Sequence, residues 1–306
     1  IQPPVKTDMR TFEQWLEDLE YFTLDEIGLD RDELPGLLER FIIRMLERCS
    51  GEQLNVESIT IMSGCDKDGN PEVPELTLKK GDVVSIVGAT GSGKSRLLSD
   101  IEWLAQGDTP TKRRVLINGQ IPPQSLRFSI DKKPVAQLSQ TMNFVMDITV
   151  EKFLHIHCDS HMIKDKDKKA KEILRAANLL SGEALKIDMP VTSLSGGQSR
   201  ALMIADTAYI STAPIVVIDE IENAGINRKN AIELLLKAEK IVLMATHDPV
   251  LALQADRRIV IKNGGIQRVI KTTDSERAVL AELERMNEKI MQCRERMRNG
   301  DLVESI

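Results

Sequence analysis

The sequence lacks the features that mark membrane-spanning and cysteine-based proteins. No stretch approaches the ~20 consecutive apolar residues that a membrane-spanning helix needs. The cysteines (Cys49, Cys65, Cys158 and Cys293) lie far apart and form no CxxC pair. We therefore expect a cytoplasmic protein with reduced thiols and no transmembrane segment of its own.

An excess of positive charge is also missing. The 306 residues carry a formal net charge of −6, which argues against general nucleic-acid binding. Hydrophobic residues make up 42% of the chain and charged residues 29%, as in an ordinary soluble globular protein. A chain of this length can form one large domain or two smaller ones with a sizeable core.

A glycine-rich segment gives the first positive indication of function. Gly88–Ser95 has the spacing GxxxxGK[ST] between an apolar strand pattern and a helical pattern. Backbone N–H groups of such a loop close around phosphate oxygens, and the following helix points its positive end at the anion. Lys94 would reach the β- and γ-phosphates, and Ser95 would ligate Mg²⁺. The predicted nucleotide contacts are Gly88, Ala89, Thr90, Gly91, Ser92, Gly93, Lys94, Ser95 and Arg96.

Two adjacent acids follow a second apolar strand pattern, Ile215–Ile218. Asp219 stands where phosphate-loop nucleotidases hold Mg²⁺, usually through water. Glu220 is placed to polarise the attacking water as a general base. The alternative is a pair of solvated acids at a strand end, but the presence of Lys94 and Ser95 in the same chain favours catalysis.

A second pair of glycines lies between these two motifs. Leu194–Gln198 opens a helical stretch, and the helix end formed by Ser195, Gly196, Gly197 and Gln198 suits an anion. One nucleotide cannot easily contact both helix ends of a single molecule. Two chains packed head to tail could each lend this second motif to the nucleotide of the other.

At this point the chain resembles the ATP-binding cassette (ABC) ATPase family. Gly88–Ser95 matches its Walker A loop, Leu194–Gln198 its signature motif, and Ile215–Glu220 its Walker B strand. Gln140 matches the Q-loop glutamine and His247 the switch histidine. The resemblance implies an ATPase that uses ATP and Mg²⁺ and forms a homodimer on ATP binding. It assigns catalysis to Lys94, Gln140, Glu220 and His247, and metal binding to Ser95, Gln140 and Asp219.

Several positions depart from the family pattern. Residues 42–102 contain no aromatic residue, so adenine would have to rest on aliphatic side chains such as Leu54 or Val56. A preference for ATP over GTP therefore stays open. The loop at residues 223–227 differs from the family sequence that communicates across the dimer, and Asp206 stands where the signature helix often has arginine.

The expected fold is an α/β P-loop NTPase of ABC type with a mainly parallel sheet core. Residues 51–272 would form the ATPase domain, with an antiparallel β portion at about 52–82 and a helical subdomain at about 141–212. The acidic, helical N-terminal extension, residues 1–50, would cover part of the core or, alternatively, dock a basic partner. Residues 273–306 would form an amphipathic C-terminal helix.

The C-terminal helix carries a regular apolar seam. Thr273 and Glu276 have capping-box spacing. Apolar residues then follow with the 4-3 spacing of a heptad repeat, at Val279, Leu283, Met286, Ile290, Cys293 and Met297. The seam would pack on the same chain or, alternatively, on a second copy or a partner.

Histidine and cysteine cluster at residues 155–161. On a helix, His157 and His161 share a face, with Cys158 beside them. This spacing could hold Zn²⁺ with an outside ligand, although no second ligand pair is obvious. The alternative is an ordinary amphipathic helix near a partner-contacting surface. Metal binding by His155, His157, Cys158 and His161 therefore stays open.

The motifs do not specify what receives the mechanical work of hydrolysis. One hypothesis is the ATP-binding subunit of a membrane transporter whose permease is a separate chain, which would hold the protein at the inner face of a membrane. The other is a soluble ABC ATPase that remodels or activates a cytosolic enzyme. Both extensions and the unusual loop at residues 223–227 give the soluble partner a slight preference.

Overall fold

A computed structural model describes residues 33–49, 55–73, 75–128, 133–139, 144–220 and 226–302. The chain divides into two compact units, residues 1–53 and 54–306. In the first unit the structure describes helix α3 (Leu34–Cys49). Its apolar side chains Phe41, Ile42 and Ile43 are exposed.

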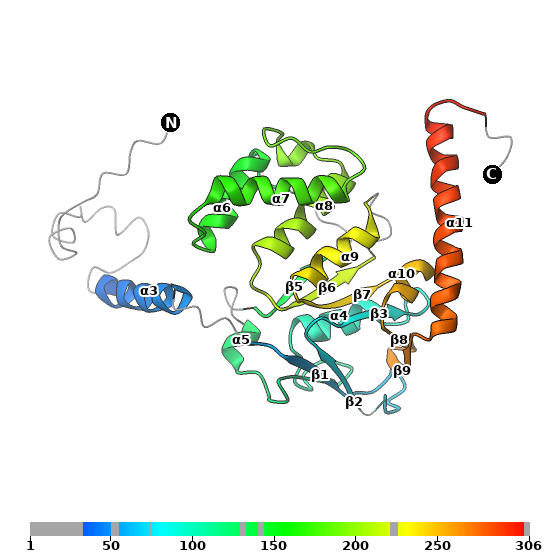
Figure 1. Cartoon of the computed structure of the whole chain (residues 1–306). Helices are drawn as coiled ribbons and strands as arrows, with labels where there is room; N and C mark the ends of the chain where they lie inside the picture. The colour runs from blue at the N-terminus through cyan, green and yellow to red at the C-terminus, as the bar shows by residue number, and fades with distance from the viewer. Residues whose placement is uncertain are drawn as a thin grey trace. The chain divides into compact units, whose positions relative to one another are not determined.

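A six-stranded sheet forms the centre of the second unit (Figure 1). The strand order is β5-β6-β7-β3-β8-β9, with parallel neighbours up to β8 and an antiparallel pairing of β8 with β9. The strands are β3 (Val83–Val87), β5 (Val135–Leu138), β6 (Ile215–Asp219), β7 (Ile241–Ala245), β8 (Arg257–Lys262) and β9 (Gly265–Lys271). The predicted α/β fold with a mainly parallel sheet is confirmed.

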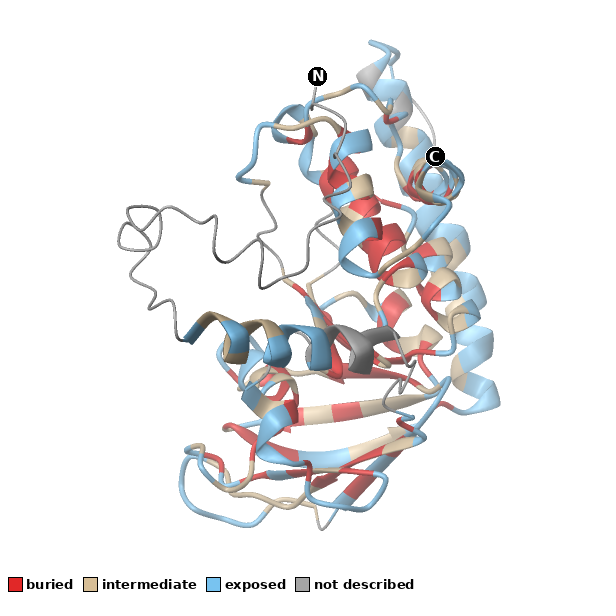
Figure 2. Ribbon diagram, turned by 90° about the vertical axis from the view of Figure 1, so that its left-hand side faces the viewer, coloured by how far each residue is buried: buried red, intermediate tan, exposed pale blue. Residues whose placement is uncertain are grey.

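Both faces of this sheet are buried, which explains its continuous apolar runs. Side chains alternate across a strand, so Ile215 and Val217 of β6 join one core cluster and Val216 and Ile218 join another. In the parallel pairing of β6 with β7, Val217 lies opposite Leu243. Figure 2 shows the buried residues concentrated in the strands and on the inner helix faces.

One face of the parallel sheet packs against α4 and an antiparallel sheet. The antiparallel sheet has the order β2-β1-β4, and these elements are β1 (Ser58–Met62), β2 (Glu75–Lys79), β4 (Arg114–Ile117) and α4 (Lys94–Glu102). Ile59, Leu78 and Leu97 lie in the core that joins the two sheets. Because β4 follows the glycine-rich segment, this antiparallel portion extends beyond the predicted residues 52–82.

Helices cover the opposite face of the parallel sheet (Figure 1). They are α6 (Val150–Ser160), α7 (Lys166–Leu180), α8 (Gly196–Tyr209), α9 (Arg228–Lys237) and α10 (Pro249–Gln254). The short helices α5 (Gln124–Phe128) and η2 (Val191–Ser193) lie in connections. Of these, α6, α7 and α8 fall within the residues predicted as a helical subdomain.

A long C-terminal helix, α11 (Asp274–Arg298), follows β9. The predicted capping box is present, because the Glu276 N–H donates to Thr273 Oγ1 at 3.3 Å and the Thr273 N–H donates to Glu276 Oε2 at 3.1 Å. The first turns of α11 lie beside α10 (Figure 1). Within the described part of the chain, no helix has both the length and the apolar character to cross a bilayer.

Candidate functional site at the carboxyl edge of the parallel sheet

The glycine-rich segment forms a tight loop between β3 and α4. Gly93 has a φ of 111°, in the left-handed region that favours glycine. A Cβ on Gly93 would lie 2.8 Å from Cα of Gly264, and one on Gly88 would lie 2.4 Å from the carbonyl oxygen of Ile261. The Gly264 N–H also donates to the Ser92 carbonyl at 2.7 Å. The loop is therefore packed directly against the turn between β8 and β9.

Lys94 begins α4 and turns its side chain back onto this loop. Its Nζ donates to the Gly88 carbonyl at 3.0 Å and lies 2.9 Å from Nε2 of His247. The residue is only 7% exposed. The phosphate-loop lysine and the predicted switch histidine are thus in direct contact.

The two predicted acids lie at the carboxyl end of β6. Ser95 Oγ, in the first turn of α4, donates to Asp219 Oδ2 at 3.1 Å. Glu220 Oε1 lies 3.7 Å from Nε2 of His247, which follows β7. Glu220 has a φ of 51°, and its N–H donates to the Ala245 carbonyl at 3.0 Å. The neighbouring strand therefore fixes a backbone conformation that non-glycine residues seldom adopt.

Strand order explains why these residues meet. β6, β7 and β3 are consecutive in the parallel sheet, so their carboxyl ends form one edge. The sheet brings Ser95, Asp219, Glu220 and His247 to that edge around Lys94. Ala89, Thr90 and Arg96 are exposed around the loop.

The signature residues begin α8, in the helical part. Ser195 is the N-cap of α8, and its Oγ accepts from the Gln198 N–H at 3.3 Å. The Gln198 Oε1 accepts in turn from the Ser195 N–H at 2.9 Å. Ser195 and Gly196 are exposed, Gly197 is partly exposed, and the side chain of Gln198 is buried in the cap. This helix end therefore faces outward with its first N–H groups accessible.

Two predicted parts of the site lie outside the described residues. They are Gln140 and residues 221–225, which include most of the loop after Asp219 and Glu220. The last residue of that loop is described. The Asn227 side chain caps α9, because its Oδ1 accepts from the Asn230 N–H at 3.1 Å, so asparagine at this position has a structural role.

Comparison with known proteins identifies the family. A sequence model described as ABC transporter matches residues 72–223. The chain is 51% identical, over 249 residues, to the uncharacterized ABC transporter ATP-binding protein MJ0121 of Methanocaldococcus jannaschii, and the match covers 81% of this chain and 95% of that protein. The chain belongs to the ABC transporter family, as one of its ATPases.

More distant matches to this ABC ATPase include longer proteins and solved structures. The macrolide export ATP-binding/permease protein MacB of a Shewanella species is 29% identical over 70% of this chain, but the match spans only 34% of MacB. Among solved structures, cbiO1 of Clostridium perfringens, part of the ABC transporter complex cbiONQ, superposes with a TM-score of 0.55. That match has 19% identity and covers 75% of this chain and 93% of cbiO1, which supports the fold.

The prediction that adenine rests on Leu54 or Val56 is wrong for Val56. Val56 is only 2% exposed and belongs to the core between the two sheets, so it has no face to offer a base. Leu54 lies outside the described residues. Packing in this core, just before β1 begins, accounts for the apolar residue at position 56.

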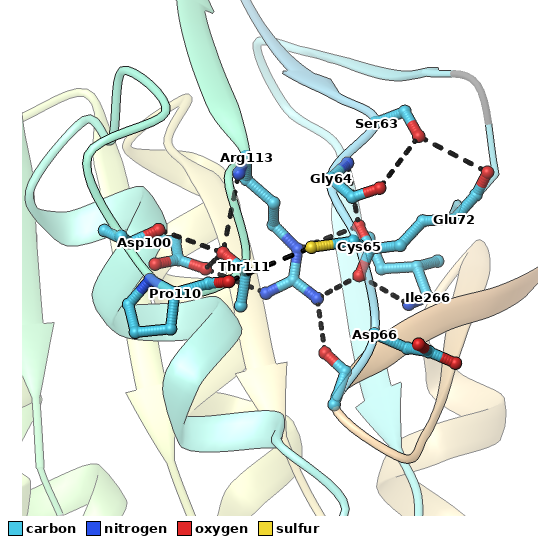
Figure 3. A network of polar contacts seen from close by, with 12 residues as sticks. Ser63, Gly64, Cys65, Asp66, Glu72, Asp100, Pro110, Thr111, Arg113 and Ile266 are labelled. Carbon is cyan, nitrogen blue, oxygen red and sulfur yellow. Dashed lines mark hydrogen bonds and ion pairs between the residues drawn. The ribbon is translucent and has the colours of Figure 1, made fainter. Parts of the chain in front are cut away.

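A buried arginine, Arg113, connects the antiparallel sheet to the turn that packs against the glycine-rich loop (Figure 3). Its guanidinium group is fully buried. It donates through Nε to Glu72 Oε2 at 2.9 Å, through Nη1 to Asp100 Oδ2 at 2.8 Å, and through Nη2 to the Gly264 carbonyl at 2.7 Å. Arg113 therefore joins α4, which carries Asp100, to the turn that packs against the phosphate loop.

Further groups donate hydrogen bonds to both carboxylates of this network. Glu72 Oε1 accepts from the Ile266 N–H at 2.9 Å, and Asp100 Oδ2 accepts from Thr111 Oγ1 at 2.8 Å. Buried charges are tolerated when they are paired and hydrogen-bonded in this way. Sequence analysis missed Arg113, because a basic run before a strand is usually solvated and its acidic partners are 41 and 13 residues away.

The histidine and cysteine cluster does not converge on one point. His157 Nδ1 lies 2.9 Å from Asp206 Oδ2, whereas His155 Nε2 lies 3.1 Å from Asp167 Oδ1. Cys158 is fully buried, and burial raises the pKa of its thiol. The hydrogen bond to Asp206 raises the pKa of His157 against the opposing effect of burial. Within the described ranges no group of three or more His, Cys, Asp or Glu side chains could hold a metal.

The departure at Asp206 now has a structural explanation. Asp206 on α8 pairs with His157 on α6, and so links two helices of the helical part. An arginine at this position could not accept that hydrogen bond.

Replacing Arg113 by methionine should lower the free energy of unfolding by about 3–5 kcal/mol, because Glu72 and Asp100 would remain as uncompensated buried charges. The matched control is Arg257→Met, which breaks a partly exposed pair with Asp82 and should cost about 0–1 kcal/mol. Urea unfolding of the three proteins measures both values. Equal losses in the two variants would contradict the role given to Arg113.

Proposed function

We propose that this ABC ATPase hydrolyses ATP at sites formed between two chains, and that the released energy changes the conformation of a separate partner protein. The observation that carries the proposal is the meeting of Lys94, Ser95, Asp219, Glu220 and His247 at one edge of the parallel sheet. These residues come from the ends of two strands, β6 and β7, and from the start of α4, and they have the complementary functions that phosphoryl transfer requires.

The side chains at this edge fit Mg²⁺ as well as phosphate. The Ser95 hydroxyl and the Asp219 carboxylate, 3.1 Å apart, are hard oxygen ligands of the kind that Mg²⁺ prefers. When bound there, the ion would neutralise charge on the β- and γ-phosphate oxygens. Gln140 is proposed as a further ligand on the family resemblance alone.

Each side chain then has a distinct task. The loop N–H groups from Gly88 to Ser95 and the Lys94 ammonium group hold the phosphates. Glu220 accepts a proton from the attacking water, and its strained backbone, fixed by Ala245, orients the carboxylate. His247 contacts both Lys94 and Glu220, so it is placed to steady the transferred phosphoryl group.

The signature motif would complete the site of a second chain. Ser195 and Gly196 are exposed at the N-terminus of α8, where N–H groups and the helix dipole favour an anion. Gln198 holds Ser195 in position through the capping box. In a head-to-tail pair of chains this helix end would cap the γ-phosphate bound by the other chain.

Mixing two inactive variants tests this shared site. Lys94→Ala removes the phosphate-loop cation. Gly196→Glu adds a repelling carboxylate in open space, since nothing lies within 4 Å of a Cβ at this position. Each variant alone should be inactive, whereas a mixed dimer retains one intact site and should restore hydrolysis to about a quarter of the wild-type rate if sites act independently.

Single-turnover hydrolysis with protein in excess of ATP provides the cleanest readout, because it does not require both sites of a dimer to work. No hydrolysis in the mixture under these conditions would contradict a site shared between chains.

For the partner we propose a membrane permease encoded as a separate chain. The support comes from the sequence relatives, which are named as an ABC transporter ATP-binding protein or as combined ATP-binding and permease proteins. The permease proposal replaces the slight preference for a soluble partner that the sequence alone suggested. A soluble enzyme remains the second candidate, because the described parts of α3 and α11 expose apolar side chains that a protein could cover.

Affinity capture distinguishes the two partners. Tagged chain carrying Glu220→Gln, with ATP and Mg²⁺, is incubated with detergent-solubilised lysate of the source organism, and bound proteins are identified by mass spectrometry. A polytopic membrane protein enriched by ATP supports the permease. A soluble enzyme enriched by ATP, with no membrane protein, would overturn that proposal and favour the second candidate.

A further inference from the structure

The apolar seam of α11 is largely uncovered by the described residues. Val279 is 49% exposed, Met286 51%, Ile290 49% and Met297 60%. The recorded contacts of α11 with the ATPase body lie in its first half, where Glu276 continues the heptad spacing of the seam and Leu283 is partly buried. They run through Glu276 to Arg258 at 2.5 Å and through Glu284 to Gln254 at 3.3 Å. The seam therefore presents an apolar stripe to which a second helix could bind.

Charge is distributed unevenly along this helix. The first half, Asp274–Glu284, contains four acids and one base, whereas the second half, Arg285–Arg298, contains five bases and two acids. The apolar stripe continues through both halves. A partner that matches the whole stripe must therefore be basic where α11 is acidic and acidic where α11 is basic. A second α11 in antiparallel orientation has this distribution.

The heptad positions agree with that orientation. In an antiparallel pair the apolar layers are Val279 with Met297, Leu283 with Cys293, and Met286 with Ile290 of the second copy. The flanking positions then place Glu282 beside Arg296 of the second copy, twice by symmetry. In a parallel pair, by contrast, Lys289 would face Arg294 and Glu282 would face an uncharged residue, Asn287.

We propose that α11 binds the α11 of a second copy as an antiparallel helix pair that forms without nucleotide. One contact opposes it, since the two copies of Lys289 face each other near the axis. The pairing is distinct from the ATP-dependent contact between phosphate loop and signature helix, and it does not depend on the identity of the partner protein. It would raise the local concentration of ATPase bodies around one another.

The test is sedimentation equilibrium of the full chain without nucleotide, over a range of concentrations. Wild type should dimerise, and Ile290→Asp should be monomeric. Glu282→Arg and Arg296→Glu should each raise the dimer dissociation constant about tenfold, because two exposed attractive pairs become repulsive. The double variant Glu282→Arg, Arg296→Glu should return to the wild-type constant, since the pairs are restored with exchanged signs.

The matched control is Glu288→Arg, on the face of α11 opposite the seam, which should leave the dissociation constant unchanged. A wild-type chain that stays monomeric at every concentration would overturn the proposal and leave the stripe to a different partner. A dimer insensitive to Ile290→Asp would place the contact elsewhere. Failure of the double variant to recover would rule out the antiparallel orientation.

Discussion

The candidate site depends on the close packing of the phosphate loop against the turn between β8 and β9. Gly93 and Gly264 approach so closely that a side chain on Gly93 would collide with the turn. Arg113 holds the turn in place, because it donates to the Gly264 carbonyl and also binds Asp100 of α4. The C-terminal part of α4, through Asp100, and the turn are thus bound to one buried group. Lys94 and Ser95 are the first two residues of the same helix. The contacts that hold α4 and the turn therefore also hold these two residues in place.

The parallel sheet supplies the second constraint, which is the order of its strands. Because β7 lies between β6 and β3, the residues that follow β7 are adjacent to both the acids and the phosphate loop. His247 occupies this place and contacts Lys94 on one side and Glu220 on the other. A local change in any one strand would therefore affect the contacts of the other two. In the helical part, by contrast, the signature residues Ser195 and Gly196 are exposed at the N-terminus of α8.

The placement of most candidate site residues could be predicted from the sequence, because they follow local patterns. A glycine-rich turn after an apolar strand, and acids or a histidine directly after further apolar strands, identify strand ends without knowledge of the fold. The contributions that were missed depend on distant pairs. Arg113 meets Glu72 and Gly264 only after the two sheets have packed, and Asp206 meets His157 only after α6 and α8 have packed. Val56 was misassigned because the sequence does not distinguish an apolar residue that faces a base from one that packs in a core.

The proposed function centres on Glu220, which is proposed to activate water at the edge that Lys94, Asp219 and His247 define. Its most direct test is phosphate release by Glu220→Gln, with ATP binding measured in parallel on the same protein. The substitution keeps the size of the side chain and removes its basicity. We expect a fall in the turnover number of about 10²–10⁴-fold, with ATP affinity retained. Turnover at the wild-type rate in a variant that still binds ATP would contradict it.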